Sequence, residues 1–346
     1  MKYCRKRDEN IRNTALSLCF EEENRRKTDP NESHERSIIV VGSKNVGKTT
    51  IVHRFLEKDE TPKPTIAIDY SYGRKIGKSL IKNVVHIWEI GYLSSSLMSA
   101  AMSGVSLTHS PAHTTILLML DLSEPESLWT TFEEIFSIIR SAMKMSYDDR
   151  TIQDLKQRRI NERKKSLEKE VDPFPLKLCI IGGKYDQFKG LDTGKRELIG
   201  KTLRAIAHTL EAGLYYHSSK DKMLVRQTKD ILSHYGFGTQ LSNSKCVDFE
   251  KPLTIAPGTD CFSSIDLQFP PTRPAAILDA IKHVYVASIP QESKNNDIIL
   301  KDPSNDFNFN EPIIDKLRAQ REEEIGVLLH DMLEGRTPQI LVPDPS

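Results

Sequence analysis

The sequence predicts an α/β domain in which helices cover a doubly wound, mostly parallel sheet. Short apolar runs rich in β-branched residues alternate along the chain with longer segments of helical periodicity. A glycine-rich string follows the first apolar run directly and leads into the first helical segment. The chain has 346 residues, which is enough for one large domain with extensions or for two modest domains.

The expected strands follow the apolar runs in chain order. The first run, Ile38 to Val41, is short and β-branched and ends at Gly42, so it indicates a buried strand. Residues 65–72 predict a strand at the edge of the sheet. The remaining runs predict four more strands, at residues 84–90, 116–120, 176–181 and 214–217.

Helical periodicity begins near Lys48 and recurs in four later segments, at residues 128–143, 195–210, 221–234 and 275–286. Most of these segments lie between two expected strands, and a helix in that position is the usual connection between parallel strands. The serine-rich stretch from Ser94 to Ser106 is expected to be a flexible loop.

Changes in composition divide the chain into four parts. Residues 1–36 carry many charges of both signs and are expected to form a flexible arm. Residues 37–238 form the α/β domain, with a charged insertion at about 144–172 that is expected to be an exposed helix or a disordered excursion. Residues 239–290 are expected to pack on the domain as an irregular and helical extension. Residues 291–346 predict a linker and an amphipathic helix at about 311–334, which docks on a partner or packs on its own domain.

Composition excludes several kinds of function. The formal net charge is +1, so nothing in the overall charge favours nucleic acid or an anionic membrane as a partner. The five cysteines contain no CxxC pair, which argues against a zinc site and against a disulfide framework. The N-terminus has no apolar run of signal-peptide length, and no stretch approaches the roughly 20 apolar residues that cross a bilayer. We therefore expect a cytosolic protein without membrane insertion.

The glycine-rich string matches the phosphate-binding pattern GxxxxGK[ST], and it lies between a predicted strand and a predicted helix as that pattern requires. Its glycines allow backbone N–H groups to point at a phosphate, and the helix N-terminus adds a favourable dipole. Lys48 is expected to contact the β and γ phosphates, and the Thr49 hydroxyl is expected to bind Mg²⁺. The predicted phosphate-binding residues are Gly42, Ser43, Lys44, Asn45, Val46, Gly47, Lys48, Thr49 and Thr50.

The order of the later segments resembles the Ras-like GTPase superfamily of P-loop NTPases. Residues 63–70 are similar to switch I, in which Thr65 matches the threonine that helps to hold Mg²⁺. The DxxG motif of that superfamily appears as Glu89, Ile90 and Gly91 with Trp88 before them, so glutamate stands where aspartate is usual. The residue after Gly91 is Tyr92, where many active GTPases have a glutamine that orients the attacking water.

The base-reading motifs also match in part. At the NKxD position the chain has Gly183, Lys184, Tyr185 and Asp186, so glycine replaces the asparagine. Residues 218–220, Ser-Ser-Lys, resemble the last base-contacting motif. The resemblance implies that the base is contacted by Lys184, Asp186, Ser219 and Lys220. Because the asparagine amide is missing, the sequence leaves guanine and adenine open as the bound base.

These departures predict a protein that binds phosphate but is not an enzyme. The phosphate half of the site is intact, whereas the water-orienting and base-reading halves depart from the superfamily pattern. The expected cofactor is a guanine or adenine nucleotide with Mg²⁺, which is structural or absent. A bound nucleotide of that kind stabilises the fold through its affinity for the native state. The alternative hypothesis is a functional nucleotide switch of the small-GTPase type.

Longer strings resemble one family, the light intermediate chains of cytoplasmic dynein, and its dynein 2 branch above all. The resemblance covers residues 37–290. It is carried by the strings GSKNVGKTT at 42–50, KPTIAIDYSYGR at 63–74, HIWEIG at 86–91, LDLSEPESLW at 120–129, DPFPLKLCIIGGKYDQF at 172–188 and KPLTIAPGTDCFSSI at 251–265. The glutamate of WEIG departs from ordinary GTPases as this family does.

The resemblance implies a GTPase-like fold in a non-catalytic accessory subunit that binds and stabilises the tail of the dynein heavy chain. For the dynein 2 branch it implies retrograde intraflagellar transport and cilium assembly. Its implied partners are the heavy chain, the intermediate and light chains of the same complex and, indirectly, intraflagellar transport particles. The implied locations are the cytoplasm, the cytoskeleton and the cilium, both its axoneme and its base.

Overall fold

The computed structural model describes residues 35–76, 82–108, 110–162, 171–241, 245–268, 276–292 and 311–335. The chain divides into two compact units, Met1–Lys294 and Asn295–Ser346. The predicted N-terminal arm lies outside the described residues up to residue 34, and its last two residues belong to the first strand instead.

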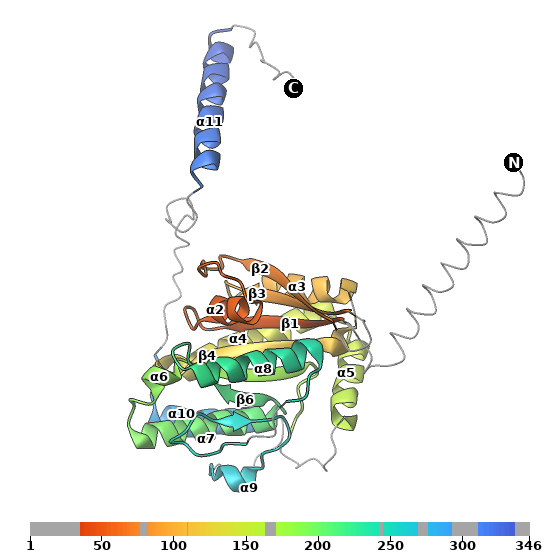
Figure 1. Ribbon diagram of the computed structural model, residues 1–346, viewed down its shortest axis with the longest axis vertical. Helices are drawn as coiled ribbons and strands as arrows, with labels where there is room; N and C mark the ends of the chain where they lie inside the picture. The colour runs from red at the N-terminus through yellow and green to blue at the C-terminus, as the bar shows by residue number, and fades with distance from the viewer. Residues whose placement is uncertain are drawn as a thin grey trace, which may run out of the picture. The chain divides into compact units, whose positions relative to one another are not determined.

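The first unit is built on a seven-stranded sheet with the order β2-β3-β1-β4-β5-β6-β7 (Figure 1). The five inner strands are parallel to one another, whereas β2 and β7 run antiparallel at the two edges. The predicted mostly parallel sheet and its edge strand are therefore confirmed. The strands are β1 (Glu35–Gly42), β2 (Ile68–Ile76), β3 (Lys82–Ile90), β4 (Thr114–Asp121), β5 (Lys177–Gly183), β6 (Gly213–Tyr216) and β7 (Thr254–Ile255).

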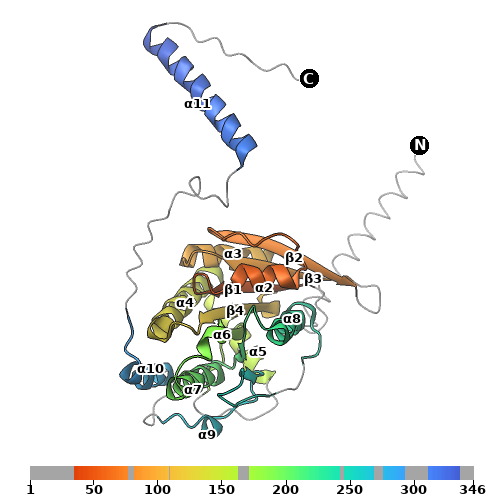
Figure 2. The ribbon, with the colours of Figure 1, turned by 60° about the vertical axis from the view of Figure 1, so that its left-hand side comes forward.

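Helices cover both faces of this sheet, as a doubly wound fold requires (Figures 1 and 2). One face packs on α2 (Lys48–Phe55) and α8 (Lys222–Phe237). The other face packs on the larger set, which contains α3 (Ser95–Thr108), α4 (Pro125–Ser146), α7 (Thr193–Thr209) and α10 (Ile277–Ser288). Shorter elements are η1 (Pro111–His113), α6 (Tyr185–Phe188) and α9 (Phe262–Ile265). The inner strands are buried from both sides, which explains their continuous apolar runs.

Two segments differ from the sequence expectation. The serine-rich stretch is the helix α3 rather than a flexible loop, because Met98, Met102 and Val105 recur at helical spacing and are fully buried. The charged insertion is only partly exposed. It begins within α4 and forms the helix α5 (Asp149–Asn161), which buries Leu155, while residues 163–170 lie outside the described residues.

Residues 245–292 add to the apolar core of the first unit, mainly through α10. Ile277, Ile281 and Tyr285 are fully buried, and the Tyr285 hydroxyl donates to the Pro125 carbonyl oxygen at 2.9 Å. The second unit contains α11 (Pro312–Leu333), which has no buried residue. Its large apolar side chains are exposed, so the surface that the amphipathic helix expected at 311–334 packs against stays a prediction. Within the residues that the structure describes, no helix has the length and apolarity to span a bilayer.

Candidate nucleotide-binding site

The phosphate-binding string forms a tight loop between β1 and α2. Gly42 packs so closely on β4 that a Cβ atom there would lie 2.1 Å from the Met119 carbonyl oxygen. Gly47 has a φ of 100°, which a side chain would strain. Lys44 and Asn45 are exposed at the tip, whereas Val46 is buried and Ser43 and Thr50 are half-buried. The two glycines thus have the positions that a phosphate cradle requires.

Lys48 is held inside this loop. Its ammonium group donates to the carbonyl oxygens of Gly42 at 3.1 Å and of Ser43 at 3.0 Å. The residue is only 7% exposed, and burial lowers the pKa of its ammonium group while the nearby Glu89 carboxylate acts to raise it. A desolvated cation at the mouth of a phosphate cradle is an efficient partner for an anion.

The two predicted Mg²⁺ ligands meet at the same buried carboxylate. The Thr49 hydroxyl donates to Glu89 Oε1 at 2.6 Å. Burial raises the pKa of Glu89, and hydrogen bonds from the Thr49 and Thr65 hydroxyls and the charge of Lys48 oppose that rise. Asp69 pairs with Glu89 across the antiparallel β2–β3 ladder and adds a second carboxylate. This hard oxygen set fits a magnesium ion beside a phosphate.

We expect Glu89→Gln to stabilise the nucleotide-free protein at neutral pH and to weaken Mg²⁺-dependent nucleotide binding. Because the pKa of Glu89 is raised above its usual 4.5, the folded protein binds more protons than the unfolded chain above that pH, and stability falls as pH rises. Glutamine keeps an oxygen that accepts from Thr49, and it does not ionise, so the variant does not lose stability as pH rises. Its Tm at neutral pH should therefore be higher by roughly 2–4 °C. Thermal unfolding at neutral and acidic pH checks this, and a lower Tm of the variant at neutral pH would contradict it.

Gly91 brings the switch I segment against the end of β3. A Cβ atom at Gly91 would lie 2.0 Å from the Thr65 carbonyl oxygen, and the Gly91 N–H donates to the Ala67 carbonyl oxygen at 2.8 Å. The structure therefore brings Thr65, Thr49 and Glu89 together, as the superfamily resemblance implies. Tyr92 follows Gly91 and is half-buried, and its phenol ring is not a group that orients water as a glutamine amide does.

On the base side, Lys184 is joined to the phosphate loop through one aspartate. Its ammonium group pairs with Asp121 Oδ2 at 2.6 Å, and the Asp121 backbone N–H donates to Ser43 Oγ at 3.2 Å. Lys184 itself has a φ of 56°, which turns the chain from β5 into α6. Asp121 was not predicted as a site residue, although its position directly after a buried strand is the signal that could have identified it.

Asp186 is held by the loop after β6. The Ser218 hydroxyl donates to Asp186 Oδ1 at 2.8 Å, and the Lys220 ammonium group pairs with Oδ2 at 2.7 Å. The hydrogen bond from Lys220 is the main reason that the pKa of Asp186 is lowered. Ser219 is exposed, and its carbonyl oxygen accepts from Arg54 of α2 at 2.8 Å. The four predicted base-contacting residues thus lie in neighbouring loops, with the Asp186 carboxylate ionised.

Behind that loop, His217 is buried and neutral. Its Nδ1 lies 2.8 Å from the Thr228 hydroxyl oxygen. Because that hydroxyl donates its own proton to the Leu224 carbonyl oxygen, Nδ1 is the protonated ring nitrogen and donates to Thr228 Oγ. Burial lowers the pKa of His217 to about 4. The backbone N–H of Tyr185 donates to the His217 carbonyl oxygen at 3.0 Å. These contacts fix the loop with Ser218 against the turn that carries Asp186.

The glycine at the NKxD position has a structural cause. A Cβ atom at Gly183 would lie 2.6 Å from Val46 Cγ2 and 3.2 Å from the Val46 carbonyl oxygen. Val46 is a phosphate-loop residue and is 5% exposed. The valine therefore fills the space that an asparagine side chain at position 183 would need.

All of these groups lie at the carboxyl ends of β1, β3, β4, β5 and β6, which is where open α/β sheets bind ligands. The phosphate loop, the hydroxyl and carboxylate set and Asp186 fit a nucleotide with Mg²⁺. Because Val46 packs on Gly183, the site has no asparagine side chain at this position to help select the base. Across the described ranges there is no cluster of three or more His, Cys, Asp or Glu side chains that could hold a metal on its own, so an ion here would need phosphate ligands.

Comparison with known proteins gives consistent relatives. No protein-family model matches the chain. The chain is 36% identical over 316 residues to the Cytoplasmic dynein 2 light intermediate chain 1 of Bos taurus, covering 86% of this chain and 88% of that protein. The protein of the same name from Homo sapiens is 36% identical over 315 residues, which cover 86% of this chain and 88% of that protein. The one from Danio rerio is 33% identical over 323 residues, which cover 88% of both chains.

A solved structure agrees with the observed fold. The crystal structure of the dynein light intermediate chain's conserved domain superimposes with a TM-score of 0.56, covering 75% of this chain and 94% of that one. Its sequence identity is 14%, so this likeness concerns the fold alone. The identities above 30% over most of both chains decide the family. The chain belongs to the cytoplasmic dynein 2 light intermediate chain family.

Proposed function

We propose that this chain is a non-catalytic accessory subunit of the cytoplasmic dynein 2 motor complex. In this role it binds and stabilises the heavy-chain tail and supports retrograde intraflagellar transport and cilium assembly. The observation that carries the proposal is the 36% identity to the bovine dynein 2 light intermediate chain over 86% of the chain. Its partners are then the heavy chain and the intermediate and light chains of the complex, and intraflagellar transport particles indirectly.

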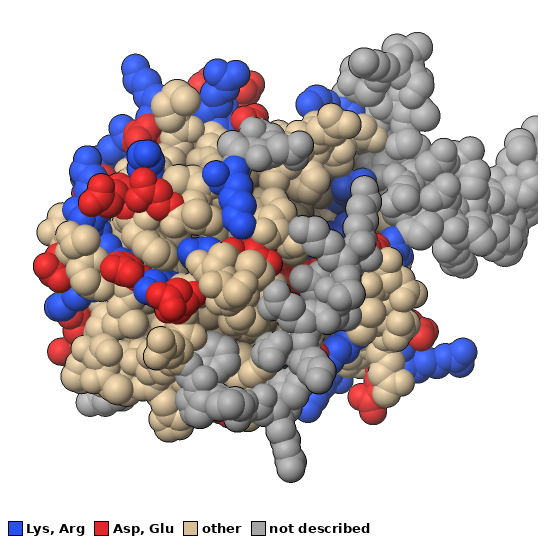
Figure 3. All heavy atoms as spheres, turned by 90° about the horizontal axis from the view of Figure 1, so that it is seen from below, with Lys and Arg blue, Asp and Glu red and all other residues tan. Residues whose placement is uncertain are grey.

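The same proposal assigns the chain to the cytoplasm, the cytoskeleton and the cilium, including its axoneme and base. It includes neither nucleic-acid binding nor membrane insertion. On the face seen in Figure 3, Lys and Arg side chains are interspersed with Asp and Glu side chains. Mixed charge of this kind provides no continuous basic surface for a polyanion on that face.

The nucleotide site takes a structural role in this proposal. A guanine or adenine nucleotide with Mg²⁺ would be held by residues 42–50, with Thr49 and Thr65 at the metal and with Lys184, Asp186, Ser219 and Lys220 at the base. The backbone of the cradle, the buried ammonium group of Lys48 and the ionised Asp186 carboxylate support binding. Tyr92 at the water-orienting position supports the absence of turnover.

The test is affinity purification of the tagged full-length chain from ciliated cells, followed by mass spectrometry of proteins and of nucleotide released by denaturation. We expect the dynein 2 heavy chain to co-purify. We also expect any bound nucleotide to be recovered without having been turned over by the protein. A Lys48→Ala variant serves as the matched control, because it removes the phosphate contact and leaves the outer surface unchanged. Recovery of the tagged chain without a dynein heavy chain would contradict the proposal.

One observation favours a nucleotide switch as the second candidate function. Thr65 and Gly91, the two positions through which a γ phosphate would act, lie in direct backbone contact and share the Glu89 carboxylate with Thr49. Multiple-turnover phosphate release from GTP and ATP separates the two hypotheses. Steady turnover that is lost in Lys48→Ala would favour the switch, and its absence would favour the structural role.

A further inference from the structure

A cavity lies at the opposite end of the sheet from the phosphate loop. Its volume is about 490 Å³. Arg36 and Lys177 line it at the beginnings of β1 and β5, and Thr115 lines it at the beginning of β4. The same β1 and β5 end at Gly42 and Gly183, the phosphate and base sides of the nucleotide site. The cavity is therefore separate from that site.

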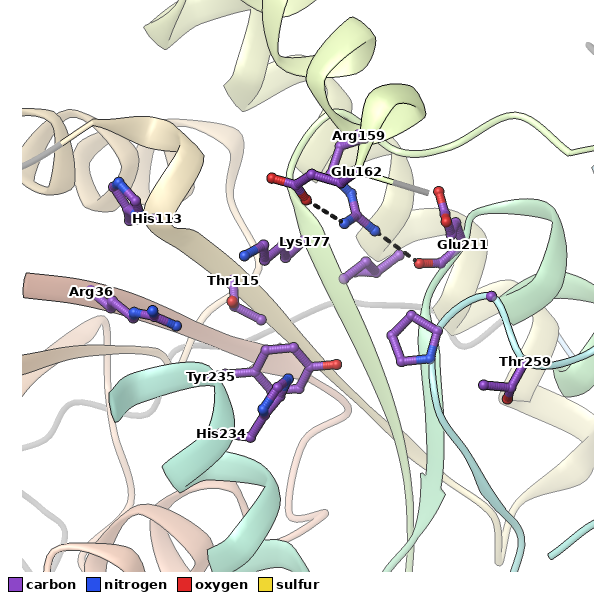
Figure 4. A pocket seen from close by; sticks show the side chains of 13 residues that line it. Arg36, His113, Thr115, Arg159, Glu162, Lys177, Glu211, His234, Tyr235 and Thr259 are labelled. Atoms are coloured by element: carbon purple, nitrogen blue, oxygen red, sulfur yellow. Dashed lines mark hydrogen bonds and ion pairs between the residues drawn. The ribbon is translucent and has the colours of Figure 1, made fainter. Parts of the chain in front are cut away.

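Three cationic side chains face into this cavity. Figure 4 shows the Arg36 guanidinium and the Lys177 ammonium group pointing toward each other across it, with Arg159 of α5 beside them. Arg36 packs over the end of α8, where its guanidinium would contact a Cβ atom at Gly238. With respect to the described residues, the side chains of Arg36 and Lys177 make neither a hydrogen bond nor an ion pair. Among the described residues, two of the three cations thus have no hydrogen-bond or ion-pair partner.

Two carboxylates, Glu162 and Glu211, line the cavity with the three cations, so they do not neutralise all of the positive charge. Glu162 accepts from Arg158 at 3.0 Å and from Arg159 at 3.4 Å, so one carboxylate serves two guanidinium groups. Arg159 also donates to the carbonyl oxygen of Glu211 at 3.2 Å. Burial lowers the pKa of Lys177, and its attraction to Glu162 is opposed by repulsion from Arg36, Arg159 and Arg158. Burial also lowers the pKa of Arg36. An anion between them would relieve both costs.

The chemistry of the cavity selects the anion. A planar guanidinium beside an ammonium group matches the oxygens of a phosphate group. The volume falls within the range of roughly 300–1,000 Å³ that is typical of sites for organic ligands, so it exceeds the needs of a single inorganic ion. We propose that this cavity binds an organic phosphate, with Arg36 and Lys177 holding its phosphate group and Arg159 completing the cationic wall.

The test is calorimetric titration of the full-length protein with inositol hexakisphosphate as the probe. We expect one binding site, which Lys177→Met and Arg36→Met each weaken by about 10- to 100-fold, because each removes a charge-assisted contact. Lys144→Met is the matched control, since Lys144 is exposed on α4 outside the cavity, and its affinity should equal that of the unmodified protein. Lys48→Ala should also bind normally, which separates this site from the phosphate loop.

A stability measurement separates binding from a structural role. Without the probe, Lys177→Met should leave Tm unchanged or raise it, because the desolvated and repelled charge is removed. With the probe, the unmodified protein should gain more Tm than Lys177→Met does. A lower Tm of the variant without the probe would overturn the proposal. So would an affinity of Lys177→Met and Arg36→Met for the probe that equals the affinity of the unmodified protein. Loss of probe binding in Lys48→Ala alone would also overturn it, independently of the dynein assignment.

Two further arms identify the source of the phosphate. Retention on phosphatidylcholine vesicles containing a phosphatidylinositol bisphosphate, lost in Lys177→Met, would support a lipid headgroup. Binding of the soluble probe without vesicle retention would support a free metabolite. Binding of an acidic peptide in place of the probe, abolished by the same variants, would overturn the proposed ligand class.

Discussion

Replacing Arg204 with methionine is expected to lower the free energy of unfolding by about 3–5 kcal/mol, because it leaves a buried carboxylate without its partner. Arg204 of α7 donates from Nε and from a terminal nitrogen to the two oxygens of Asp260, each at 2.8 Å. The side chains are 2% and 4% exposed. Burial acts to raise the pKa of Asp260, but the Arg204 contacts outweigh it and the pKa is lowered.

This pair joins the extension after residue 245 to α7. Arg204 also donates to Ser264 Oγ at 3.1 Å, and its guanidinium lies 5.6 Å from the centre of the Phe249 ring. When Arg204 is removed, the nearest remaining cation is Lys245, which is exposed and lies 3.4 Å from Asp260 Oδ1. It can compensate only in part, so the extension should loosen first.

Urea denaturation followed by circular dichroism measures the change, and hydrogen exchange over residues 245–268 locates it. Lys201→Met on the same helix is the matched control, because Lys201 pairs with the more exposed Glu197 and Asp266 and should contribute about 0–1 kcal/mol. The double variant Arg204→Met with Asp260→Asn should recover part of the loss, since no unpaired charge remains. A loss below about 1 kcal/mol in Arg204→Met would contradict the buried-pair argument.

The parts of the fold and site that the sequence predicts are those fixed by short-range pattern. Inner strands such as β1 and β5 are recognisable because burial on both faces demands a continuous apolar run. Gly42, Gly47 and Lys48 are recognisable because their spacing is dictated by one loop conformation around a phosphate. Thr65 was located through its place in the order of motifs, and the structure brings it to Glu89.

The parts that the sequence did not reveal depend on contacts between distant segments. Five serines in α3 obscured the helical spacing of its buried methionines, and only the sheet beneath them decides that the segment is helical. The sequence placed Arg36 in the flexible arm and Lys177 in a predicted strand, yet the topology brings them to one cavity. Asp121 acquires its role from Lys184 and Ser43, which lie 63 positions after it and 78 before it. No local pattern encodes such distances.

Gly183→Asn, which restores the asparagine of the NKxD motif, is expected to destabilise the protein by about 1–3 kcal/mol. The reason is space, because the new Cβ atom would lie 2.6 Å from Val46 Cγ2 and the valine is buried and stiff at χ1. Thermal and urea unfolding of the nucleotide-free protein measure the loss. A Gly183→Asn variant as stable as the unmodified protein would contradict this prediction, because it would show that the phosphate loop moves to accommodate the new side chain at little cost.

Removing the obstructing methyl groups should reverse the effect. In the double variant Val46→Ala with Gly183→Asn, the Cγ2 contact disappears and only the 3.2 Å approach to the Val46 carbonyl oxygen remains. We expect it to be more stable than Gly183→Asn alone, whereas Val46→Ala alone should lose stability because it leaves a cavity. If the missing amide is what leaves the base unselected, the double variant should also prefer GDP over ADP more strongly than the unmodified protein does in competition binding. Equal preference in the two proteins would assign base recognition to Asp186 and its neighbours instead, because the amide would then contribute nothing that the Asp186 carboxylate does not already provide.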